Sequence, residues 1–212
     1  MSMNETNNNE KANQITDRWF HFLYIVIWPF FNLFRPVRAI GRENIPEGPA
    51  VLCPNHSTIG DPFYVTFGFG YKHVMRALAK IQIMRLPFIG WILGKGGVYG
   101  VDRDTADLKA VKSGLKSLKD GRKLLLFPEG TRVRDGMTVE PKTGAALFAT
   151  RTNSPLLPIW IPRKKKLFRF NTIVIGEPYY PEFEGRKATT EDLERITKDL
   201  MERINKLGEG RS

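Results

Sequence analysis

The sequence predicts an α/β fold in which a mostly parallel β-sheet is flanked by helices. Two observations support this prediction. Short apolar runs alternate with amphipathic helical patterns from about residue 50 onward, which is the order that a parallel sheet with crossover helices requires. The chain has 212 residues, of which 42% are hydrophobic. That is enough for one sizeable core and too short for two large domains.

The N-terminal region divides into two predicted segments. Residues 1–17 are polar and rich in asparagine, which predicts a flexible tail because they offer little apolar surface. Residues 18–38 contain the apolar run WFHFLYIVIWPFFNLF between arginines. The run is shorter than the ~20 residues of a helical span and contains Pro29. We therefore predict an interfacial membrane helix segment that acts as an anchor; the alternative is a first helix buried in the domain.

Residues 39–212 are predicted to form the single folded domain. The boundary is the turn-rich stretch GRENIPEGP, and the runs after it are short and separated by turn signals, as strands of a buried sheet are. The expected strands are AVLC from Ala50, VYGV from Val98, KLLLF from Lys123, PLLPIWI from Pro155 and TIVI from Thr172.

Two helices can be read from periodic apolar positions and capping residues. The first is expected to be capped by Asp104 or Thr105 and to bury Leu108, Val111, Leu115 and Leu118. The second follows a capping box formed by Thr189 and Asp192 and is expected to bury Leu193, Ile196, Leu200, Ile204 and Leu207.

The charge of the chain points to anionic partners. Lysine and arginine number 33 against 22 acidic residues, for a net charge of +11. Phospholipid head groups, phosphate-bearing substrates, acidic proteins and nucleic acid all fit this charge. The single cysteine, Cys53, excludes an intrachain disulfide, and the three histidines are not paired with cysteine at zinc-ligand spacing. We expect a reduced compartment and no structural metal.

The segment NHSTIGDP is the first candidate for chemistry. It follows an apolar strand, and Gly60, Asp61 and Pro62 suit a turn and a helix start. His56 then lies at the carboxyl end of a strand, where open α/β sheets place their sites. If Asp61 folds back to His56, the carboxylate can hold one ring nitrogen and leave the other to take a proton from a hydroxyl. Alternatively, Asp61 only caps the helix.

Three further segments carry candidate phosphate ligands. FPEGTR places Glu129 and Arg132 at a strand end, and arginine offers a bidentate fork for phosphate. GGVYGVDR delivers Arg103 from a second short strand, and Lys142 lies near a helix start, where free backbone N–H groups also attract anions. Taken singly, each cation is as readily explained by a solvated surface position. The segment SPLLPIWIP is expected to be core.

Taken together and in order, NHSTIGDP, GGVYGVDR, FPEGTR and PLLPIWIP resemble the four motif blocks of the glycerophospholipid acyltransferase family. Within it, the 1-acylglycerol-3-phosphate (lysophosphatidic acid) acyltransferases are the nearest match. The resemblance implies that His56 is the catalytic base and that Asp61 orients it. It implies that the substrate is bound by Arg103, Glu129, Gly130, Thr131, Arg132, Lys142 and, in a less defined role, Lys80.

The resemblance also implies the reaction. An acyl group would pass from acyl-CoA or acyl carrier protein to the sn-2 hydroxyl of lysophosphatidic acid, making phosphatidic acid for phospholipid biosynthesis without cofactor or metal. The hydroxyl would attack the thioester and a thiolate would leave; the sequence does not show what holds the oxyanion. An anionic membrane surface is the expected partner, nucleic acid is not, and the expected location is peripheral or monotopic at the cytoplasmic face of the cell membrane.

Several alternatives stay open. One alternative is an acyltransferase whose acceptor is glycerol-3-phosphate or another lysophospholipid. A hydrolase would use Ser57 or Cys53 as nucleophile, although Ser57 lacks a G-x-S-x-G elbow. A non-enzymatic protein would bind anionic membranes or nucleic acid through the lysine face of the helix after Asp104 and the RKKK run at Arg163. Gly100 stands where relatives often carry a bulky apolar residue, which leaves the shape of the acyl region open.

Overall fold

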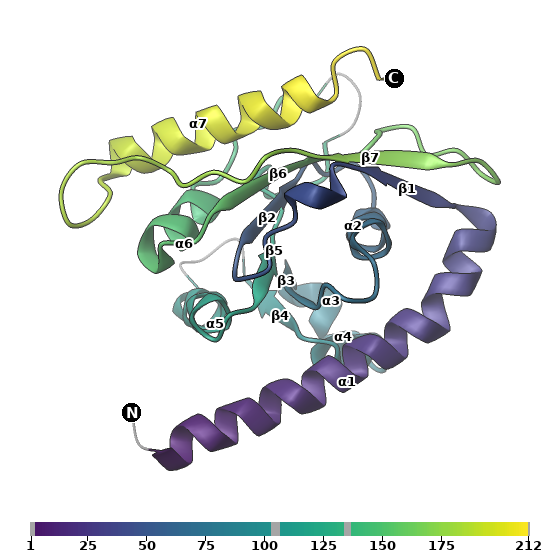
Figure 1. Ribbon diagram of the computed structural model, residues 1–212, viewed down its shortest axis with the longest axis horizontal. Helices are drawn as coiled ribbons and strands as arrows, with labels where there is room; N and C mark the ends of the chain where they lie inside the picture. Colours follow the sequence, from purple (N-terminus) through teal and green to yellow (C-terminus); the bar gives the residue numbers. More distant parts are fainter. Residues whose placement is uncertain (1–2, 103–106, 134–136, 212) are drawn as a thin grey trace.

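A seven-stranded sheet forms the centre of the computed structural model, which describes residues 3–102, 107–133 and 137–211 (Figure 1). Within this part of the chain, neighbouring strands run parallel except for β6 and β7. The strand order is β1-β7-β6-β2-β5-β3-β4. The strands are β1 (Val37–Ile40), β2 (Val51–Pro54), β3 (Met75–Lys80), β4 (Val98–Val101), β5 (Lys123–Leu125), β6 (Leu156–Trp160) and β7 (Asn171–Ile175). The α/β prediction is confirmed.

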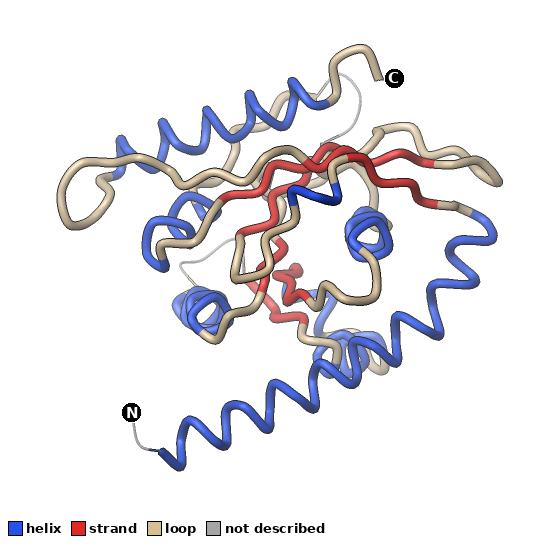
Figure 2. The backbone as a smooth tube through the Cα atoms, in the orientation of Figure 1, coloured by secondary structure: helices blue, strands red, loops and turns tan. Residues whose placement is uncertain are grey.

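Helices cover both faces of the sheet (Figure 2). Helices α1 and α2 pack into one hydrophobic cluster with the sheet, and α5, α6 and α7 pack into a second cluster on the opposite face. The helices are α1 (Met3–Phe34), α2 (Asp61–Phe69), α3 (Ile81–Met84), α4 (Ile89–Lys95), α5 (Leu108–Lys119), α6 (Gly144–Thr152) and α7 (Thr190–Leu207), with a 3-10 turn at Arg42–Asn44.

The central strands β2, β5 and β6 place three loops at one edge of the sheet. Strand β2 is buried throughout and pairs in parallel with β5 on one side and β6 on the other. Parallel strands end at the same edge. The segments that follow, NHSTIGDP, FPEGTR and IPRKKK, therefore meet there and supply the candidate site.

Two strands escaped prediction from the sequence, and each has a physical reason. Strand β3 reads MRALAK, a composition that favours helix, yet it is held in the sheet between β4 and β5. Strand β1 begins at Val37, inside the predicted anchor 18–38, and pairs with β7 far along the chain. Pairing with distant partners decides both strands, which is a tertiary effect that local propensity does not report.

The predicted tail at residues 1–17 is wrong for the part that the structure describes. Helix α1 begins at Met3 and runs unbroken to Phe34. Asp17, on this helix, pairs with Arg76 and Arg122, in each case with an N–O distance of 2.8 Å. Because Arg76 is 1% exposed, this buried ion pair docks the polar part of α1 on the domain.

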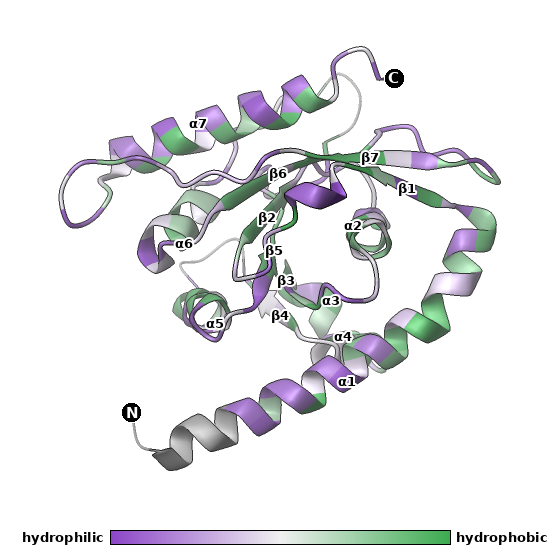
Figure 3. Ribbon diagram, in the orientation of Figure 1, coloured by the Kyte–Doolittle hydropathy of each residue, from purple (hydrophilic) through white to green (hydrophobic). Residues whose placement is uncertain are grey.

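The remainder of α1 packs on one side and is open on the other. Phe20 is buried, and Tyr24 and Phe31 lie against the core. The opposite side exposes a row of large apolar side chains, which includes Phe22, Ile25, Val26, Trp28, Phe30, Leu33 and Phe34. In Figure 3, the ribbon of this part of α1 carries several green, hydrophobic segments. Among the described residues, no helix is long and apolar enough to cross a membrane.

The two helices read from the sequence are present, with one correction. The N-cap of α5 is Asp107, whose side chain accepts from Ala110 N at 2.9 Å, while Asp104 and Thr105 lie outside the described residues. Leu108 is 69% exposed, so its predicted burial is wrong; it precedes the first full turn and faces away from the sheet. The capping box of α7 is confirmed, and the buried positions of that helix are Ile196, Thr197, Leu200 and Ile204.

Candidate active site

His56 and Asp61 meet at the carboxyl end of β2. His56 Nδ1 lies 2.9 Å from Asp61 Oδ2, because the chain turns through Gly60 and starts α2 at Asp61. Asp61 was expected to be the N-cap of this helix, but the N-cap is Gly60 and Asp61 is the first helical residue. Ionised Asp61 only accepts hydrogen bonds, so Nδ1 is the donor and Nε2 is left unprotonated. The ring stacks on Phe127, with 3.9 Å between centroids.

The carboxylate of Asp61 is fully enclosed and held from several directions. Oδ2 also accepts from the backbone N–H groups of Ser57 at 2.6 Å and Thr58 at 2.8 Å, and Oδ1 accepts from Thr58 Oγ1 at 2.8 Å and Lys165 Nζ at 2.6 Å. Burial opposes the ionisation of Asp61, but the bond from His56 and the charge of Lys165 hold its pKa well below the usual range. The pair is therefore preorganised.

Asn55 ties the catalytic loop to β6. Its Nδ2 donates to Ile161 O at 2.9 Å, and its Oδ1 accepts from Ile161 N at 2.7 Å. Both bonds are buried. Through them the Asn55 side chain extends the hydrogen bonding between β2 and β6 beyond the last residues of the two strands. Because Asn55 precedes His56 directly, this bidentate contact fixes the backbone from which the base projects.

Glu129, from the loop after β5, supports the same backbone. Its Oε2 accepts from His56 N at 2.5 Å, and Oε1 faces Arg163 Nη2 at 3.5 Å. Val133 N donates to His56 O at 2.8 Å, so both backbone groups of His56 are bonded to the FPEGTR loop. Burial raises the pKa of Glu129, against the bond from His56 and the charge of Arg163.

A cavity of about 670 Å³ opens beside His56. It gathers almost all of the predicted site residues at the sheet edge. Its polar and charged lining consists of His56, Lys80, Glu129, Gly130, Thr131, Arg132, Glu140 and Lys142. Asp61 stands behind His56, and Arg103 lies outside the described residues. The predicted ligands thus converge from four separate segments, which a chance set of surface charges would not do.

The basic side chains of this cavity are open to solvent. Lys80, Arg132 and Lys142 are exposed, and within the described part of the chain none of them has an ion-pair partner. Gly130 has φ +66°, and a Cβ there would meet Lys142 Cγ at 2.9 Å. Glycine thus allows the FPEGTR loop to approach Lys142 closely, and it gives three cations one space in which to bind an anion.

A second, apolar cavity of about 310 Å³ adjoins the first. The two share six wall residues, which are Ile59, Pro62, Leu78, Ala79, Ile83 and Phe127. Its far wall comes from α1, through Phe20, Leu23, Tyr24 and Ile27. His56 lines the basic cavity, and Phe127, on which its ring stacks, belongs to the wall that the two cavities share.

The comparison with known protein families agrees with this geometry. A family model described as Acyltransferase matches residues 36–162, which hold the His56–Asp61 pair and the FPEGTR loop. The chain belongs to the acyltransferase family. The expectation drawn from the four motif blocks is therefore confirmed at the level of the family.

Several relatives of this acyltransferase carry the name 1-acyl-sn-glycerol-3-phosphate acyltransferase. That of Pseudomonas aeruginosa is 31% identical over 162 residues, covering 71% of this chain and 62% of the relative. That of Borreliella burgdorferi is 29% identical over 178 residues, covering 78% and 69%. That of Bacillus subtilis is 29% identical over 178 residues, covering 81% and 87%. The match thus spans under two thirds of the Pseudomonas protein.

A solved structure shares the fold. The crystal structure titled as the 1-acyl-sn-glycerophosphate (LPA) acyltransferase PlsC from Thermotoga maritima aligns with a TM-score of 0.61 at 22% identity. The alignment covers 100% of this chain and 86% of that one. At this identity the likeness establishes the common architecture, a sheet with helices on both faces.

The acyltransferase site includes residues that the sequence did not single out. Asn55 and Arg163 hold the loops, and Lys165 touches Asp61. The RKKK run was considered as a surface for binding anionic membranes or nucleic acid, but the Lys165 side chain is 2% exposed, so this residue is not part of such a surface. The only sequence signal for the burial of Lys165 was its position. The run follows the buried strand β6, and alternate residues of such a segment can turn inward.

Gly100 is explained by packing in the acyltransferase fold. It lies on β4, and a Cβ at this position would come 2.5 Å from Ile81 Cδ1 and 3.1 Å from Met84 Cγ. It does not line the apolar cavity. Glycine at this position therefore lets α3 approach β4 closely.

The two hydrolase nucleophiles are poorly placed. Cys53 is fully buried in β2, and burial raises the pKa of its thiol. Ser57 Oγ accepts a hydrogen bond from Lys165 Nζ at 2.5 Å. A lysine can activate a serine only as a neutral amine. Burial lowers the pKa of Lys165, but its ion pair with ionised Asp61 opposes this shift and favours the ammonium form, which has no lone pair to take a proton.

Proposed function

We propose that this acyltransferase moves a fatty acyl group from a thioester to the sn-2 hydroxyl of lysophosphatidic acid and so makes phosphatidic acid. The observation that carries the proposal is the position of His56 in the basic cavity, stacked on Phe127 in the wall shared with the apolar cavity. Lysophosphatidic acid brings a phosphate and a free hydroxyl, and the acyl donor brings a fatty chain. The site offers a cationic space, a base and an apolar space for these three parts. The names of the relatives support this acceptor.

In the proposed mechanism, His56 Nε2 takes the proton from the acceptor hydroxyl. The oxygen then attacks the thioester carbonyl carbon, the C–O bond forms, and the C–S bond of the tetrahedral intermediate breaks. The thiolate leaves and the proton on His56 passes to it or to water. Asp61 holds Nδ1 as the donor and stabilises the imidazolium while it exists. A thiolate is a good leaving group, so one base suffices.

The phosphate of the acceptor is proposed to lie among Lys80, Arg132 and Lys142. Arginine can bind two phosphate oxygens at once, and the two lysines add charge. Gly130 and Thr131 offer the backbone and hydroxyl of the same loop. Glu129 is proposed to act by holding His56, because its carboxylate is directed at the His56 amide and Arg163. Arg103 remains a proposed ligand from the neighbouring strand end.

The acyl donor is proposed to be acyl-CoA or acyl carrier protein, with its chain in the apolar cavity. Both donors present the same thioester, and both are anionic, in keeping with a chain of net charge +11. No cofactor or metal enters the proposed reaction. The alternative acceptors are glycerol-3-phosphate and other lysophospholipids, which share the hydroxyl and the phosphate.

The test is a transfer assay in detergent micelles. Lysophosphatidic acid, glycerol-3-phosphate and other lysolipids are each offered with acyl-CoA or acyl carrier protein, and acylated product is measured. We expect product from lysophosphatidic acid with the wild type and with His73→Ala, a matched histidine outside both cavities. We expect at least about 10³-fold less with His56→Ala. Product from another acceptor only would overturn the acceptor and keep the chemistry.

We further propose that the outer side of α1 from Arg18 to Phe34 lies in the interface of an anionic membrane at the cytoplasmic face. The catalytic domain begins with β1 rather than at residue 39, because Val37 and Arg38 of the predicted segment 18–38 belong to the sheet. The exposed apolar row of α1 supports this, and the loop after β6 extends it. There Leu167, Phe168 and Phe170 are exposed, and Phe168 N donates to Phe34 O at 2.7 Å. The two apolar surfaces thus meet at the end of α1.

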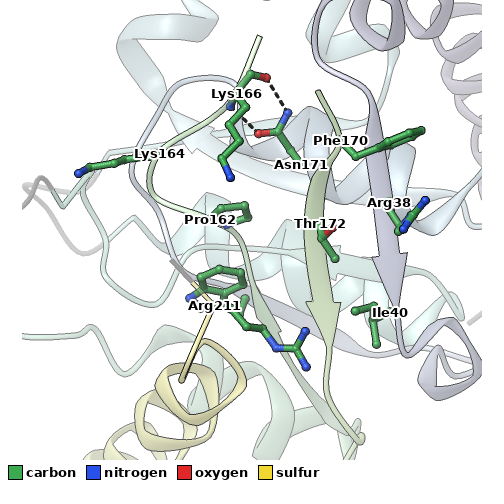
Figure 4. A pocket seen from close by; sticks show the side chains of 10 residues that line it. Arg38, Ile40, Pro162, Lys164, Lys166, Phe170, Asn171, Thr172 and Arg211 are labelled. Atoms are coloured by element: carbon green, nitrogen blue, oxygen red, sulfur yellow. Dashed lines mark hydrogen bonds between the residues drawn. The ribbon is translucent and has the colours of Figure 1, made fainter. Parts of the chain in front are cut away.

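Charges next to this surface suit anionic lipid. A groove of about 280 Å³ lies beside Phe170 and is lined by the cations Arg38, Lys164, Lys166 and Arg211 (Figure 4). Apolar side chains inserted among head groups and cations at head-group depth are what an interfacial surface needs. The same charges make zwitterionic bilayers the weaker partner.

Vesicle sedimentation tests this placement. We expect the protein to sediment with phosphatidylglycerol vesicles more than with phosphatidylcholine vesicles. The double variant Phe30→Ser and Leu33→Ser should bind at least about tenfold more weakly, because each side chain loses about 1.5–3 kcal/mol of apolar burial. Leu108→Ser is the matched control, an exposed leucine on the opposite face of the sheet. Equal binding by all three proteins would refute the anchor.

A further inference from the structure

Lys165 contacts the carboxylate that orients His56. Its Nζ lies 2.6 Å from Asp61 Oδ1, while His56 Nδ1 bonds Oδ2 at 2.9 Å. The side chains of Lys165 and Asp61 are 2% and 0% exposed. We propose that Lys165 is a positioning residue for acyl transfer, which keeps Asp61 ionised and fixed so that His56 presents a free Nε2 to the acceptor hydroxyl. The role in transfer rests on the proposed function.

The loop between β6 and β7 is tied down on both sides of Lys165. Arg163 Nη1 donates to Val133 O at 3.0 Å. Buried Asn171 holds the next residue by both of its backbone groups, since Oδ1 accepts from Lys166 N at 2.7 Å and Nδ2 donates to Lys166 O at 2.9 Å (Figure 4). A residue between two such anchors has little backbone freedom, so the ammonium group is delivered to one place.

The inward and outward residues of this loop differ in function. Lys164 and Lys166 line the basic groove and are exposed, whereas Lys165 points the other way and lies with its Nζ 5.8 Å from the ring centroid of Tyr64. Enclosing a lysine head group is costly unless a charge partner compensates for the lost hydration. The charge partner of Lys165 is Asp61, so each of the two buried charges compensates for the hydration that the other has lost.

An enclosed aspartate needs this cation to remain ionised. The other donors to Asp61, apart from His56, are the neutral backbone and hydroxyl groups of Ser57 and Thr58. Without Lys165, burial would favour the protonated acid. A protonated Asp61 bonds His56 less strongly and stabilises the imidazolium less. The lysine therefore acts on the reaction through Asp61 and does not touch the substrate.

The charge of Lys165 also bears on the pH range of the reaction. The working form pairs a neutral imidazole with an ionised carboxylate, and a nearby cation opposes the uptake of one more proton. The charged groups that face Lys165 are Asp61 on α2, Arg163 in its own loop and Arg35 after α1, with Glu129 beyond Arg163. With a neutral side chain at position 165, we expect the acid limb of the activity profile to move to higher pH.

The experiment compares Lys165→Met and Lys165→Arg with the wild type, with Lys198→Met on the exposed side of α7 as control. Transfer is measured from about pH 5 to pH 10. For Lys165→Met we expect kcat to fall about 10- to 100-fold with little change in acceptor KM, and the acid limb to rise by about one pH unit. Lys165→Arg keeps the charge and should leave the limb in place. An equal loss at every pH with an unmoved limb would overturn the proposal.

Two additions keep the test decisive. Lys165→Gln retains a donor for Asp61 without the charge and should show the same limb shift, which covers the case that Lys165→Met does not fold.

Nuclear magnetic resonance of the histidine rings needs no substrate, and His56→Ala identifies the His56 signals. Their transition should occur at higher pH in Lys165→Gln than in the wild type. If it does so while no acceptor is acylated, the proposed function fails and the positioning role stands; if it does not move, the role is refuted.

Discussion

The His56–Asp61 half of the site and the Lys80–Arg132–Lys142 half are built in opposite ways. The first is buried, and both oxygens of Asp61 and both backbone groups of His56 are bonded to protein. The second is exposed, and within the described residues its cations are unpaired. The groups proposed to move a proton are therefore fixed in advance, while those proposed to bind phosphate become ordered only when the ligand binds.

The sharpest test of the fixed half is Asp61→Asn. We expect kcat to fall about 10³-fold or more, because an amide can hold His56 in the wrong tautomer. Lys165 would also be left enclosed without its partner, at a cost of about 3–5 kcal/mol in the free energy of unfolding. Steady-state kinetics and thermal melting measure the two effects. His56→Ala separates them, since it should lose the activity but keep most of the stability.

Arg132→Met tests the open half. Losing a charged hydrogen-bond donor of about 1.5–3 kcal/mol should raise the acceptor KM about 10- to 100-fold and leave kcat within a few fold. Arg151→Met, an exposed arginine on α6, is the control and should behave as the wild type. A fall in kcat with unchanged KM would mean that the two halves are not separable.

Ala77→Phe tests the apolar cavity that adjoins the basic one. Ala77 is in the cavity wall on β3, and a phenyl ring there should fill part of the space. We expect the preference to shift toward shorter acyl chains by about tenfold, the scale set by one or two lost methylene contacts. Val98→Ala, in the same wall, enlarges the cavity and should shift it the other way. Competition between donors of different length reads out both.

Thr189→Ala provides the smallest expected effect and a baseline for the others. Thr189 caps α7 through its bond from Asp192 N at 3.1 Å, on the side of the sheet away from the two cavities. Its removal should cost about 1 kcal/mol of stability and leave kcat and KM unchanged. Denaturant unfolding and the transfer assay check this. A loss of transfer here would show that activity follows global stability rather than the site.

Much of the fold could be read from the sequence because local signals agreed with tertiary ones. The runs at Ala50, Lys123 and Pro155 are apolar, short and bounded, and they became the central strands β2, β5 and β6. Strands β1 and β3 were less legible. MRALAK is helical by composition and becomes β3 only because two neighbours pair with it.

The N-terminal helix shows the limit from another direction. Its first turns are polar, so composition predicts a tail. The decisive contacts are Asp17 with Arg76 and Arg122, two arginines that lie far away in sequence and in no motif. Leu108 shows the opposite error. Its spacing predicts burial with the apolar stripe of α5, but it is the first residue of that helix and is exposed.

The candidate site, like the fold, could be predicted only in part from the sequence. His56, Asp61, Glu129 and Arg132 lie in compact motifs whose spacing indicates chemistry, and the structure brings them to one cavity or its wall. Lys165 is one cation in a run of four, and nothing local distinguishes it from Lys164 or Lys166. Only the turn of the loop, set by Asn171, decides which lysine faces Asp61.

The pairing of β1 with β7 carries a consequence for synthesis of the chain. Val37 is aligned with Asn171, so the strand that follows α1 finds its partner only after most of the protein has been made. Pairings so distant in sequence form late and slowly. Helix α1, with its open apolar side, leaves the ribosome long before that. During this interval its outer row can meet a bilayer first, and the domain would then be assembled at the surface where it is proposed to work.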